Sequence, residues 1–510
     1  MNLFIAQSLL TDINWWLIAP EVIVCTAAVV VMLVDAFARP PQRWITGAIS
    51  IGGLLAAAVS SGWLWSSYSG VTEAFKGMIV LDPLRLGFTL VFLLVSCLTV
   101  LVSMVWVESE QLPAGEFHSL LLFATAGMLF MASGGDLVII FLGLEILSIA
   151  TYVMAGFRRS DVRSNEASLK YFILGSFSSA FLLYGIALTY GATGINGTAG
   201  TTNIARIASS VNAAQYPALL FAGVAMMLVG FGFKIATAPF HVWTPDVYEG
   251  APTPVTALFS AGPKAAAFAL LLRIFATVPA ATHFWFWAFW ALAALTMFAG
   301  NLGALVQTNV KRLLAYSSIA HAGYILVAFA AVTSMAQGEG GAAKAAPAYA
   351  AVLFYLLSYA LMKLGAFTIV SQLGGAGEKN LLLDDYAGLS QRQPWVAAAL
   401  SVYLLSLLGL PVTAGFFGKF YIFKAAVNSH LLWLAVLMAI NSIIGAYYYL
   451  RVIVVMYMRE SSAEAASAPR VGFPLTVNFV LAFTVAGTLY FGLFPNQVLN
   501  FILQPTLLGR

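Results

Sequence analysis

Six ionisable side chains stand inside long apolar stretches of this 510-residue chain. A charge at the centre of a bilayer costs roughly 3 kcal/mol on insertion scales, so such residues are rare and usually functional. Lysine and glutamate can each hold and release a proton, and these residue types therefore suggest proton transfer. The six residues are Glu145, Lys170, Lys234, Lys264, Lys363 and Lys419.

Two histidines, His241 and His321, are weaker candidates for the same chemistry. A lone histidine in a helical protein is more often a satisfied core residue than a proton carrier. Position favours both, because His241 follows Pro239 by two residues. His321 lies about two and a half helical turns beyond the pair Lys311 and Arg312, which should mark a membrane surface.

Each charged residue also has a structural interpretation. A lysine near a helix end commonly extends its amine to the headgroups, and this is the alternative for Lys170 and, less strongly, for Lys234. For Glu145, Lys264 and Lys419 the alternative is an ion pair that only holds helices together. Lys363 is alone in its helix, and a structural role is the alternative there too.

Composition places the chain among integral membrane proteins. Hydrophobic residues make up 61% of it and charged residues 9%, where a soluble domain carries roughly a quarter charged residues. We expect an all-α polytopic fold of about fourteen transmembrane helices. The expected spans are 16–38, 44–65, 82–107, 117–134, 137–157, 166–190, 216–240, 252–279, 282–304, 312–334, 346–372, 394–423, 430–456 and 472–493. The weakest division is the turn at residues 133–136, between the fourth and fifth spans, and a count of thirteen is the alternative.

The distribution of basic residues predicts the orientation of these spans. Lysine and arginine in alternate loops mark the cytoplasmic side. One face carries Arg39, Arg43, Arg158, Arg159, Arg163, Lys311, Arg312, Lys379, Arg392, Arg459 and Arg470, and the other mainly Lys76, Arg206, Lys344, Lys424 and Arg510. Both termini should therefore face away from the cytoplasm. The first apolar run is too long for a signal peptide, so we expect no cleaved signal.

No cofactor or nucleic-acid site is expected in this chain. Cys25 and Cys97 both lie in apolar spans, without the spacing of iron–sulfur, zinc or disulfide frameworks. Neither a glycine-rich dinucleotide motif after a strand nor a Walker loop is present. The net charge of +4 follows from the basic loops and requires no nucleic-acid partner.

Two stretches interrupt the plain apolar helices in comparable places of the two halves. The first runs from Lys234 past Pro239 to His241, and the second from Gly409 past Pro411 to Lys419. Proline removes a backbone donor and clashes with the preceding turn, so each stretch should break its helix beside a lysine. Paired broken helices indicate an inverted-repeat transporter with its ion path at the breaks.

Three motifs carry a resemblance to a known family. Residues 231–254 read Phe-Gly-Phe-Lys-Ile-Ala-Thr-Ala-Pro-Phe-His-Val-Trp-Thr-Pro-Asp-Val-Tyr-Glu-Gly-Ala-Pro-Thr-Pro and run on to Gly-Pro-Lys264. Residues 311–324 read Lys-Arg-Leu-Leu-Ala-Tyr-Ser-Ser-Ile-Ala-His-Ala-Gly-Tyr, and residues 409–420 read Gly-Leu-Pro-Val-Thr-Ala-Gly-Phe-Phe-Gly-Lys-Phe. Together they resemble the antiporter-like membrane subunits of proton-pumping NADH:quinone oxidoreductase, respiratory complex I. Within that family, the three motifs resemble most the subunit N branch, which comprises the homologues of mitochondrial subunit 2.

The resemblance implies an arrangement of the chain. Three amino-terminal helices would occupy 1–116, a first five-helix unit 117–279, a second, inverted unit 280–456, and a last helix 457–510. The broken helices would lie near 234–241 and 409–419. The implied proton path is Glu145, Lys170, Lys234, Lys264 and Lys419, with His321 and Lys363 near the polar axis that would join the two half-channels. His241, two residues after Pro239, is a further candidate for the path.

The resemblance also implies partners. FMN, iron–sulfur clusters and the quinone would be bound by other subunits, including a peripheral NADH dehydrogenase arm. Adjacent antiporter-like and small helical subunits would flank this one in a bacterial cytoplasmic membrane. Two rival hypotheses stay open: a subunit of a multisubunit cation/proton antiporter, and a scaffold whose charges only hold helices together. Opening a unit charge pair at 4 Å changes the energy by roughly 4 kcal/mol at an effective dielectric of about 20, enough to drive one proton across a membrane.

Overall fold

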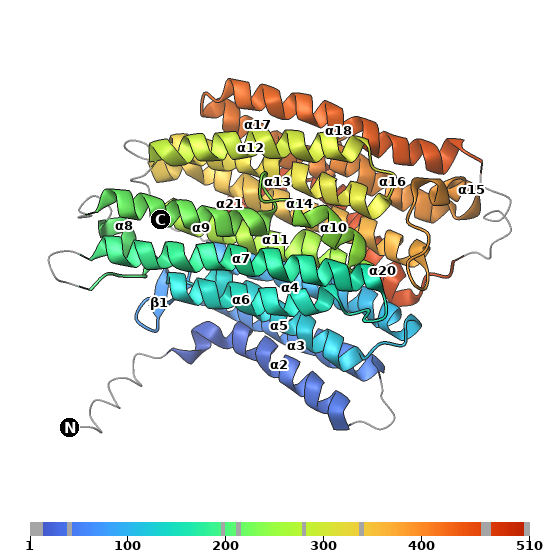
Figure 1. The fold of residues 1–510 in the computed structure, drawn as a ribbon, viewed down its shortest axis with the longest axis horizontal. Helices are drawn as coiled ribbons and strands as arrows, with labels where there is room; N and C mark the ends of the chain where they lie inside the picture. The colour runs from blue at the N-terminus through green and yellow to red at the C-terminus, as the bar shows by residue number, and fades with distance from the viewer. Residues whose placement is uncertain are drawn as a thin grey trace.

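The computed structural model describes residues 14–37, 43–194, 199–210, 216–277, 282–335, 341–460 and 471–503. Over these residues the chain is a bundle of long helices that run roughly side by side (Figure 1). Arg39, Arg470 and Arg510, which helped to predict the orientation, lie outside the described residues, and so does the side chain of Lys344.

The elements follow the expected spans closely. The amino-terminal part comprises η1 (Trp15–Ile18), α2 (Ala19–Phe37), α3 (Arg43–Ser66), β1 (Thr72–Ala74), β2 (Ile79–Leu81) and α4 (Pro83–Ser109). The middle comprises α5 (Ala114–Ser133), α6 (Leu137–Ala155), α7 (Val162–Thr193), α8 (Ile204–Ser210), α9 (Pro217–Ile235), α10 (Trp243–Gly250) and α11 (Thr253–Thr277). The remainder comprises α12 (Thr282–Leu305), α13 (Val310–Met335), α14 (Gly341–Gly374), η4 (Leu383–Tyr386), α15 (Leu389–Arg392), α16 (Pro394–Leu408), α17 (Ala414–Asn428), α18 (Leu432–Met458), α20 (Leu475–Leu493) and α21 (Pro495–Leu503).

Aspartates begin three of the long helices. The side chains of Asp82, Asp136 and Asp161 accept hydrogen bonds from backbone N–H groups in the first turns of α4, α6 and α7. Such a cap satisfies a donor that the helix itself leaves unpaired. The Asp136 cap explains why the turn at residues 133–136 separates α5 from α6, as the sequence predicts.

Thirteen helices in the described part of the chain are long and apolar enough to cross a membrane. The expected span 394–423 is divided instead into α16 and α17, neither of which is that long. With this pair counted as one crossing, the expected number of spans is confirmed. The chain is an integral membrane protein.

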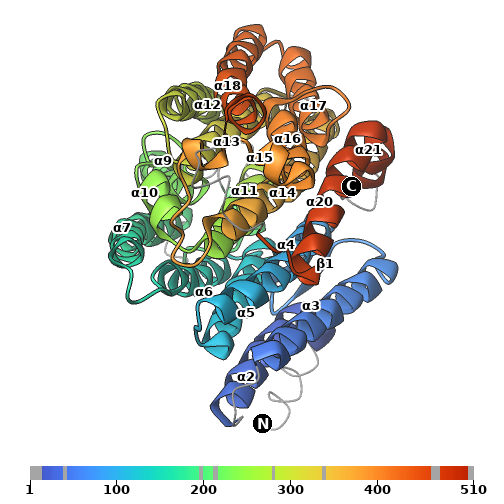
Figure 2. The same cartoon turned by 90° about the vertical axis from the view of Figure 1, so that its right-hand side faces the viewer.

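The centre of the bundle is formed by α11, α13 and α14. Every residue of the apolar window in α11 is buried, as are 94% of the window in α13 and 89% in α14, against 33% in α7 and α20. Viewed from one end, α11 and α14 lie inside the bundle, while α2 and α3 lie at its edge (Figure 2). A lysine on α11 or α14 is therefore far from lipid.

One end of the bundle, which we call the arginine-rich end, gathers the loops with most of the described basic residues. Arg158 contacts Glu110 at 3.0 Å and Glu378 at 3.7 Å, and Lys311 contacts Glu378 at 2.8 Å. Burial alone would raise the pKa of the Glu378 carboxyl, but Lys311 and Arg158 outweigh this effect and hold that pKa below its usual range. These pairs fix the loop after α14 against α13 and the loop after α6.

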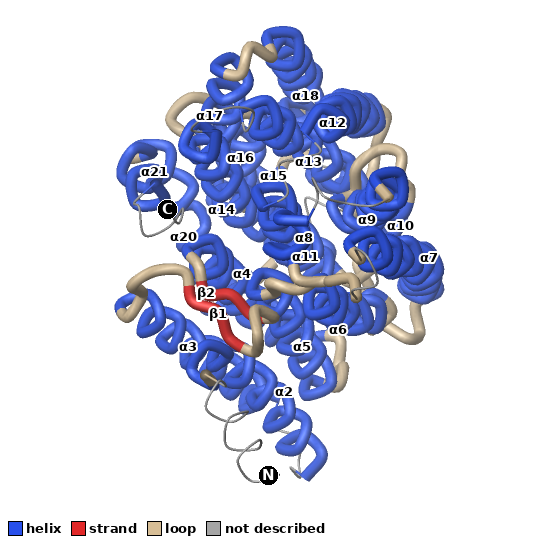
Figure 3. The backbone as a smooth tube through the Cα atoms, turned by 90° about the vertical axis from the view of Figure 1, so that its left-hand side faces the viewer, coloured by secondary structure: helices blue, strands red, loops and turns tan. Residues whose placement is uncertain are grey.

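A short β-hairpin lies at the opposite end and departs from the all-helical expectation. Strands β1 and β2 pair antiparallel, with Thr72 opposite Leu81 (Figure 3). The turn between them needs left-handed backbone at three positions, and it includes Gly77, whose carbonyl accepts from Asn203 Nδ2 at 3.0 Å. Periodicity alone does not reveal strands of three residues.

Candidate functional site

The first predicted break is present and leaves Lys234 in an aromatic pocket. Helix α9 ends at Ile235, Ala236 adopts a left-handed conformation with φ 59°, and α10 begins at Trp243. The Lys234 side chain is 6% exposed and its Nζ has no hydrogen-bond partner. That nitrogen lies 5.2 Å from the centre of the Tyr152 ring and 5.3 Å from that of Tyr171. Ring faces stabilise the ammonium form by cation–π attraction without accepting a proton.

Glu145 forms an ion pair with neither Lys234 nor Lys170. The carboxylate of Glu145 on α6 accepts a hydrogen bond from Ser179 on α7 at 2.5 Å. Among the residues described, no cationic nitrogen lies within 4.0 Å of it, although its charge acts on Lys234. The half-buried Glu145 and the buried Lys234 are therefore separate in this conformation.

Lys170 points to the arginine-rich end because two carboxylates are available there. Its Nζ lies 2.7 Å from Glu166 and 2.7 Å from Asp246. These residues line a cavity of about 240 Å³, which we call the vestibule, together with Arg163, Ala167, Glu249, Gly250 and Arg312. Burial alone would raise the pKa of the Asp246 carboxyl, but Lys170 and Arg312 outweigh this effect and lower it.

A row of hydrogen bonds begins at Lys264 in the centre of the bundle. Lys264 on α11 is 2% exposed and donates to the backbone oxygen of Ser318 at 2.8 Å and to its Oγ at 2.6 Å. The hydroxyl of Tyr359 on α14 donates to the same Oγ at 2.8 Å. The side chain of Ser318 therefore joins the central lysine to α14.

A second set of hydrogen bonds surrounds His321. Its Nδ1 lies 2.7 Å from the hydroxyl of Tyr355, and its Nε2 lies 3.1 Å from that of Tyr449. The Tyr449 hydroxyl lies 2.5 Å from Ser317 Oγ, which accepts from Lys363 at 3.0 Å. The predicted residues His321 and Lys363 are thus connected through two groups that the sequence analysis did not single out.

The second predicted break presents Lys419 to a freed carbonyl. Helix α16 ends at Leu408, and Gly409 adopts φ 95°, a left-handed conformation that suits glycine. Lys419 on α17 donates to the Leu408 oxygen at 2.8 Å and to Ser442 Oγ on α18 at 2.9 Å. Its Nζ lies 4.8 Å from the centre of the Tyr324 ring, and that ring is 5.5 Å from the ring of His321.

Asn301 on α12 closes one side of this region. Its Nδ2 donates to the Tyr324 hydroxyl at 3.0 Å and to Asn441 Oδ1 at 3.1 Å, and its Oδ1 accepts from the Tyr448 hydroxyl at 3.0 Å. The amide is completely buried. It holds Tyr324, which contacts both the lysine and the histidine, and Tyr448, which packs on Tyr449.

His241 stands apart from this row. It lies in the first break, half-buried, and its Nδ1 has no hydrogen-bond partner. No direct hydrogen bond joins Lys234 to Lys264 among the described residues. Apart from Lys170, the predicted residues thus fall into a group around Lys234, a hydrogen-bonded set at Lys264 and a second set that joins Lys363 to His321. Lys419 has acceptors of its own and reaches His321 through ring contacts of Tyr324.

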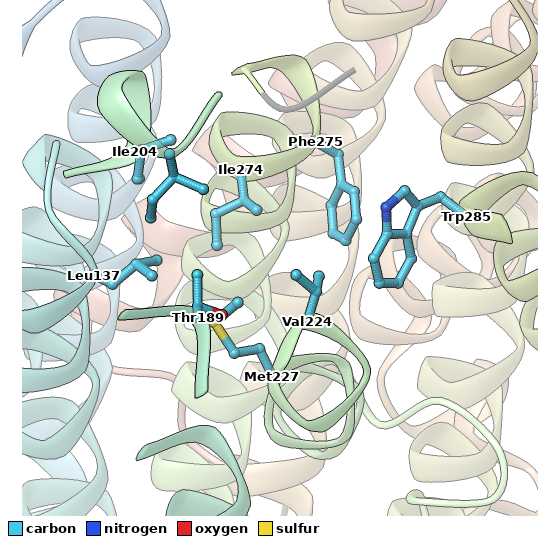
Figure 4. Close-up of a pocket in the computed structure, with 9 residues that line it drawn as sticks. Leu137, Thr189, Ile204, Val224, Met227, Ile274, Phe275 and Trp285 are labelled. Atoms are coloured by element: carbon cyan, nitrogen blue, oxygen red, sulfur yellow. The ribbon is translucent and has the colours of Figure 1, made fainter. Parts of the chain in front are cut away.

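An apolar cavity lies at the end opposite the vestibule (Figure 4). It is lined by Leu137, Thr189, Ile204, Ile207, Val224, Met227, Ile274, Phe275 and Trp285. The hydroxyl of Thr189 is already satisfied by the Gly185 carbonyl at 2.9 Å. A water molecule needs several polar partners, so this apolar cavity is a poor site for water.

Sequence reasoning missed the serines and tyrosines that connect the charged groups. For some of these residues, the spacing along the sequence could have predicted their place beside the charged groups. Ser317 and Ser318 precede His321 by four and three residues, and Tyr355, Tyr359 and Lys363 follow one another at intervals of four. Residues at these spacings share one face of a helix. In the described part of the chain, no group of three or more His, Cys, Asp or Glu side chains could hold a metal ion.

Many helices, two breaks beside buried lysines and a polar row between them define an antiporter-like membrane subunit. The family model described as the transmembrane region of NADH:quinone oxidoreductase and Mrp antiporters matches residues 134–445. The chain belongs to this family.

Sequence relatives show which branch of the family the chain resembles. NADH-quinone oxidoreductase subunit N of Trichlorobacter lovleyi is 45% identical over 507 residues, 99% of both chains. A subunit N of Koribacter versatilis is 46% identical over 505 residues, 98% of both chains. The resemblance to the subunit N branch is confirmed.

Solved structures share the fold. A chain of respiratory complex I from Thermus thermophilus, solved with bound aureothin, is 34% identical with a TM-score of 0.78, and the match covers 96% of this chain and all of that one. A chain of the archaeal membrane-bound sulfane sulfur reductase is 26% identical with a TM-score of 0.81, over 95% of each chain. The antiporter-like fold thus extends over nearly the whole chain.

Proposed function

We propose that this chain translocates protons as subunit N of an NADH:quinone oxidoreductase in a bacterial cytoplasmic membrane. The observation that carries the proposal is a polar row made of two buried hydrogen-bonded sets. Lys264 bonds Ser318, and Lys363 is connected through Ser317 and Tyr449 to His321. The two sets adjoin where the rings of His321 and Tyr359 lie 5.1 Å apart. Buried amines of this kind are expensive in a membrane interior and are retained where they carry ions. The full-length relatives named subunit N supply the complex in which the row would work.

The row offers groups that can both give and take a proton. A lysine amine accepts a proton when neutral and donates one when charged, and hydroxyl and imidazole groups do both. A proton arriving at Lys264 could pass through Ser318 and Tyr359, and one leaving His321 could pass through Tyr449 and Ser317. Transfer to Lys419 requires a rearrangement or water, since its Nζ is bonded to Leu408 and Ser442.

The path would run from the arginine-rich end to the opposite end. The vestibule with Lys170 opens at the arginine-rich end, which the positive-inside rule assigns to the cytoplasm, with both termini on the other side. Glu145 and Lys234 would form the loading site, and His241 would serve the same break. Lys419 would then stand on the exit side.

The inverted repeat belongs to this proposal. Each predicted five-helix unit, 117–279 and 280–456, contains a break whose helix ends at a left-handed residue, Ala236 in one and Gly409 in the other. A buried lysine lies beside each break, Lys234 at the first and Lys419 at the second. This correspondence supports two half-channels of opposite orientation.

The electron-carrying groups would lie in partner subunits. FMN and iron–sulfur clusters would occupy the peripheral NADH dehydrogenase arm, and this chain would contribute proton transfer without a redox centre of its own. Its neighbours would be another antiporter-like subunit and small helical subunits. A cation/proton antiporter is the alternative assignment, and a native complex extracted in mild detergent without flavin and iron–sulfur subunits would favour it.

The test is to count protons moved per NADH oxidised by the assembled complex in vesicles. Replacing the buried amine in Lys264→Ala should lower that ratio. The exposed Lys424 on α17 provides the matched control, because Lys424→Ala removes a lysine outside the row. An assembled Lys264→Ala complex that pumps at the wild-type ratio would overturn the proposal and leave the scaffold hypothesis.

A further inference from the structure

Helix α10 connects two environments within eight residues. Trp243 at its start is 4% exposed and lies in the aromatic surroundings of Lys234. Asp246 and Glu249, one and two turns later, line the vestibule. The helix therefore runs outward from the pocket of Lys234 to the charged cavity at the arginine-rich end.

Three rings stand together at the inner end of this helix, and we call them the aromatic lid: Tyr171, Phe233 and Trp243. The Trp243 ring stacks on Tyr171 with centroids 4.5 Å apart and 11° between the planes. It also stacks on Phe233 at 5.1 Å, and its Nε1 donates to the Phe233 oxygen at 3.0 Å. The Tyr171 ring in turn contacts the amine of Lys234 at 5.3 Å.

Ion pairs on the vestibule side of the aromatic lid keep α10 in place. Lys170, which precedes Tyr171, contacts Asp246 at 2.7 Å, and Arg312 on α13 contacts the other oxygen of Asp246 at 2.7 Å. Arg312 also contacts Glu249 at 2.9 Å. These ion pairs tie α10 to both α7 and α13. Moving α10 away from Lys234 requires that they break or rearrange.

We propose that Trp243 and Asp246 are positioning residues that separate Lys234 from the vestibule, the aromatic lid excluding water and the ion pairs of Asp246 setting how often the lid opens. The inference rests on the proposed function of Lys234 as a proton carrier. When α10 moves, a water molecule of the vestibule reaches the neutral amine and donates a proton to the nitrogen lone pair, which leaves Lys234 as an ammonium. The hydroxide that remains returns to the aqueous phase at the arginine-rich end. The closed lid then prevents return of that proton.

The lid predicts how fast a small reagent reaches Lys234 in the resting complex. Reductive methylation with formaldehyde and a borane modifies exposed neutral amines, and mass spectrometry of this chain measures the initial rate at each lysine. Lys424 is exposed and lies on α17, away from the lid, so it reacts readily and serves as an internal reference. The assembled complex is used throughout, without NADH.

Two variants should open the lid. Trp243→Ala removes a ring and Asp246→Asn weakens both tethers, and each should raise the methylation rate of Lys234 relative to Lys424. For Asp246→Asn the expected rise is about fivefold, as for the loss of a partly exposed ion pair. Trp243→Phe keeps a ring and should have a smaller effect. Glu166→Gln is the matched control, since Glu166 also contacts Lys170 but lies on α7, and the Lys234 rate should stay at the wild-type value.

An unchanged Lys234 rate in both Trp243→Ala and Asp246→Asn would overturn the inference. Should Asp246→Asn fail to assemble, Arg312→Gln removes the tether on the other side of the same carboxylate and must give the increase. This readout is separate from pumping. Normal pumping by Lys234→Ala would defeat the proposed function, whereas a rate that does not respond to the lid variants would defeat the lid alone.

Discussion

The two broken helices present their lysines to different surroundings. Lys234 has aromatic rings and no hydrogen-bond acceptor, while Lys419 donates to the Leu408 carbonyl and to Ser442. Both amines are buried. Direct acceptors hold an amine in place by hydrogen bonds, whereas ring faces attract it without a fixed bond. The Lys419 amine must therefore break two hydrogen bonds before it can move, and the Lys234 amine breaks none.

The largest effect is expected from removing the amine at the first break. Lys234→Ala should lower coupled quinone reduction by about tenfold, or about 1.4 kcal/mol, because this step has no other buried amine beside it. Lys234→Arg should not restore activity, since a guanidinium does not release its proton. NADH-dependent quinone reduction and proton uptake are measured on assembled complex in vesicles. Normal proton stoichiometry in Lys234→Ala would remove this lysine from the path.

The second break should respond differently to the same kind of change. Lys419→Met keeps much of the side-chain volume and should permit assembly, yet reduce pumping by about fivefold, or about 1 kcal/mol. Lys419→Glu should keep part of the function, because a carboxylate also relays protons. Protons are counted per NADH oxidised. A wild-type ratio in Lys419→Met would make the second break structural and erase the contrast between the two lysines.

Glu145 tests whether the first break has a distant partner. Glu145→Gln should impair turnover more than Glu145→Asp, which keeps the charge. In double-mutant cycles the Glu145 and Lys234 variants should couple by more than about 0.5 kcal/mol, and the Glu145 and Lys170 variants should be additive within that value. The reason is that Lys170 is occupied by Glu166 and Asp246. Additivity in both cycles would show that Glu145 acts on neither lysine.

The smallest effect is expected at Ser442, one of the two acceptors of Lys419. Ser442→Ala leaves the Leu408 carbonyl in place and should change the pumping rate by less than about threefold, in line with the modest net value of one hydrogen bond. The matched change at the first break is Ser179→Ala, which removes the donor to Glu145. Rates are compared at saturating NADH. If Ser442→Ala lowers the pumping rate as much as Lys419→Met does, the serine rather than the lysine amine is the essential group at the second break.

The sequence predicts what is local and misses what depends on helix rotation. Pro239, Pro411 and the nearby glycines place both breaks correctly, because their backbone effects act within one helix. The direction in which the Lys170 side chain points could not be predicted from such local effects. Its amine goes to Asp246, 76 residues away, and that choice depends on how α7 and α10 are turned toward each other. The link between Ser317 and Tyr449 has the same character, since it joins α13 to α18.

The buried amide of Asn301 would limit the proposed proton path on one side. Hydroxyl, imidazole and amine groups pass a proton on by accepting one and releasing another, whereas a carboxamide is neither a useful acid nor a useful base near neutral pH. Asn301 contacts Tyr324, Tyr448 and Asn441, so it terminates the polar row on the side of α12 and α18. The amide satisfies the hydrogen bonds of the tyrosines as water would, but on the proposed path it would block a proton where water would pass it on.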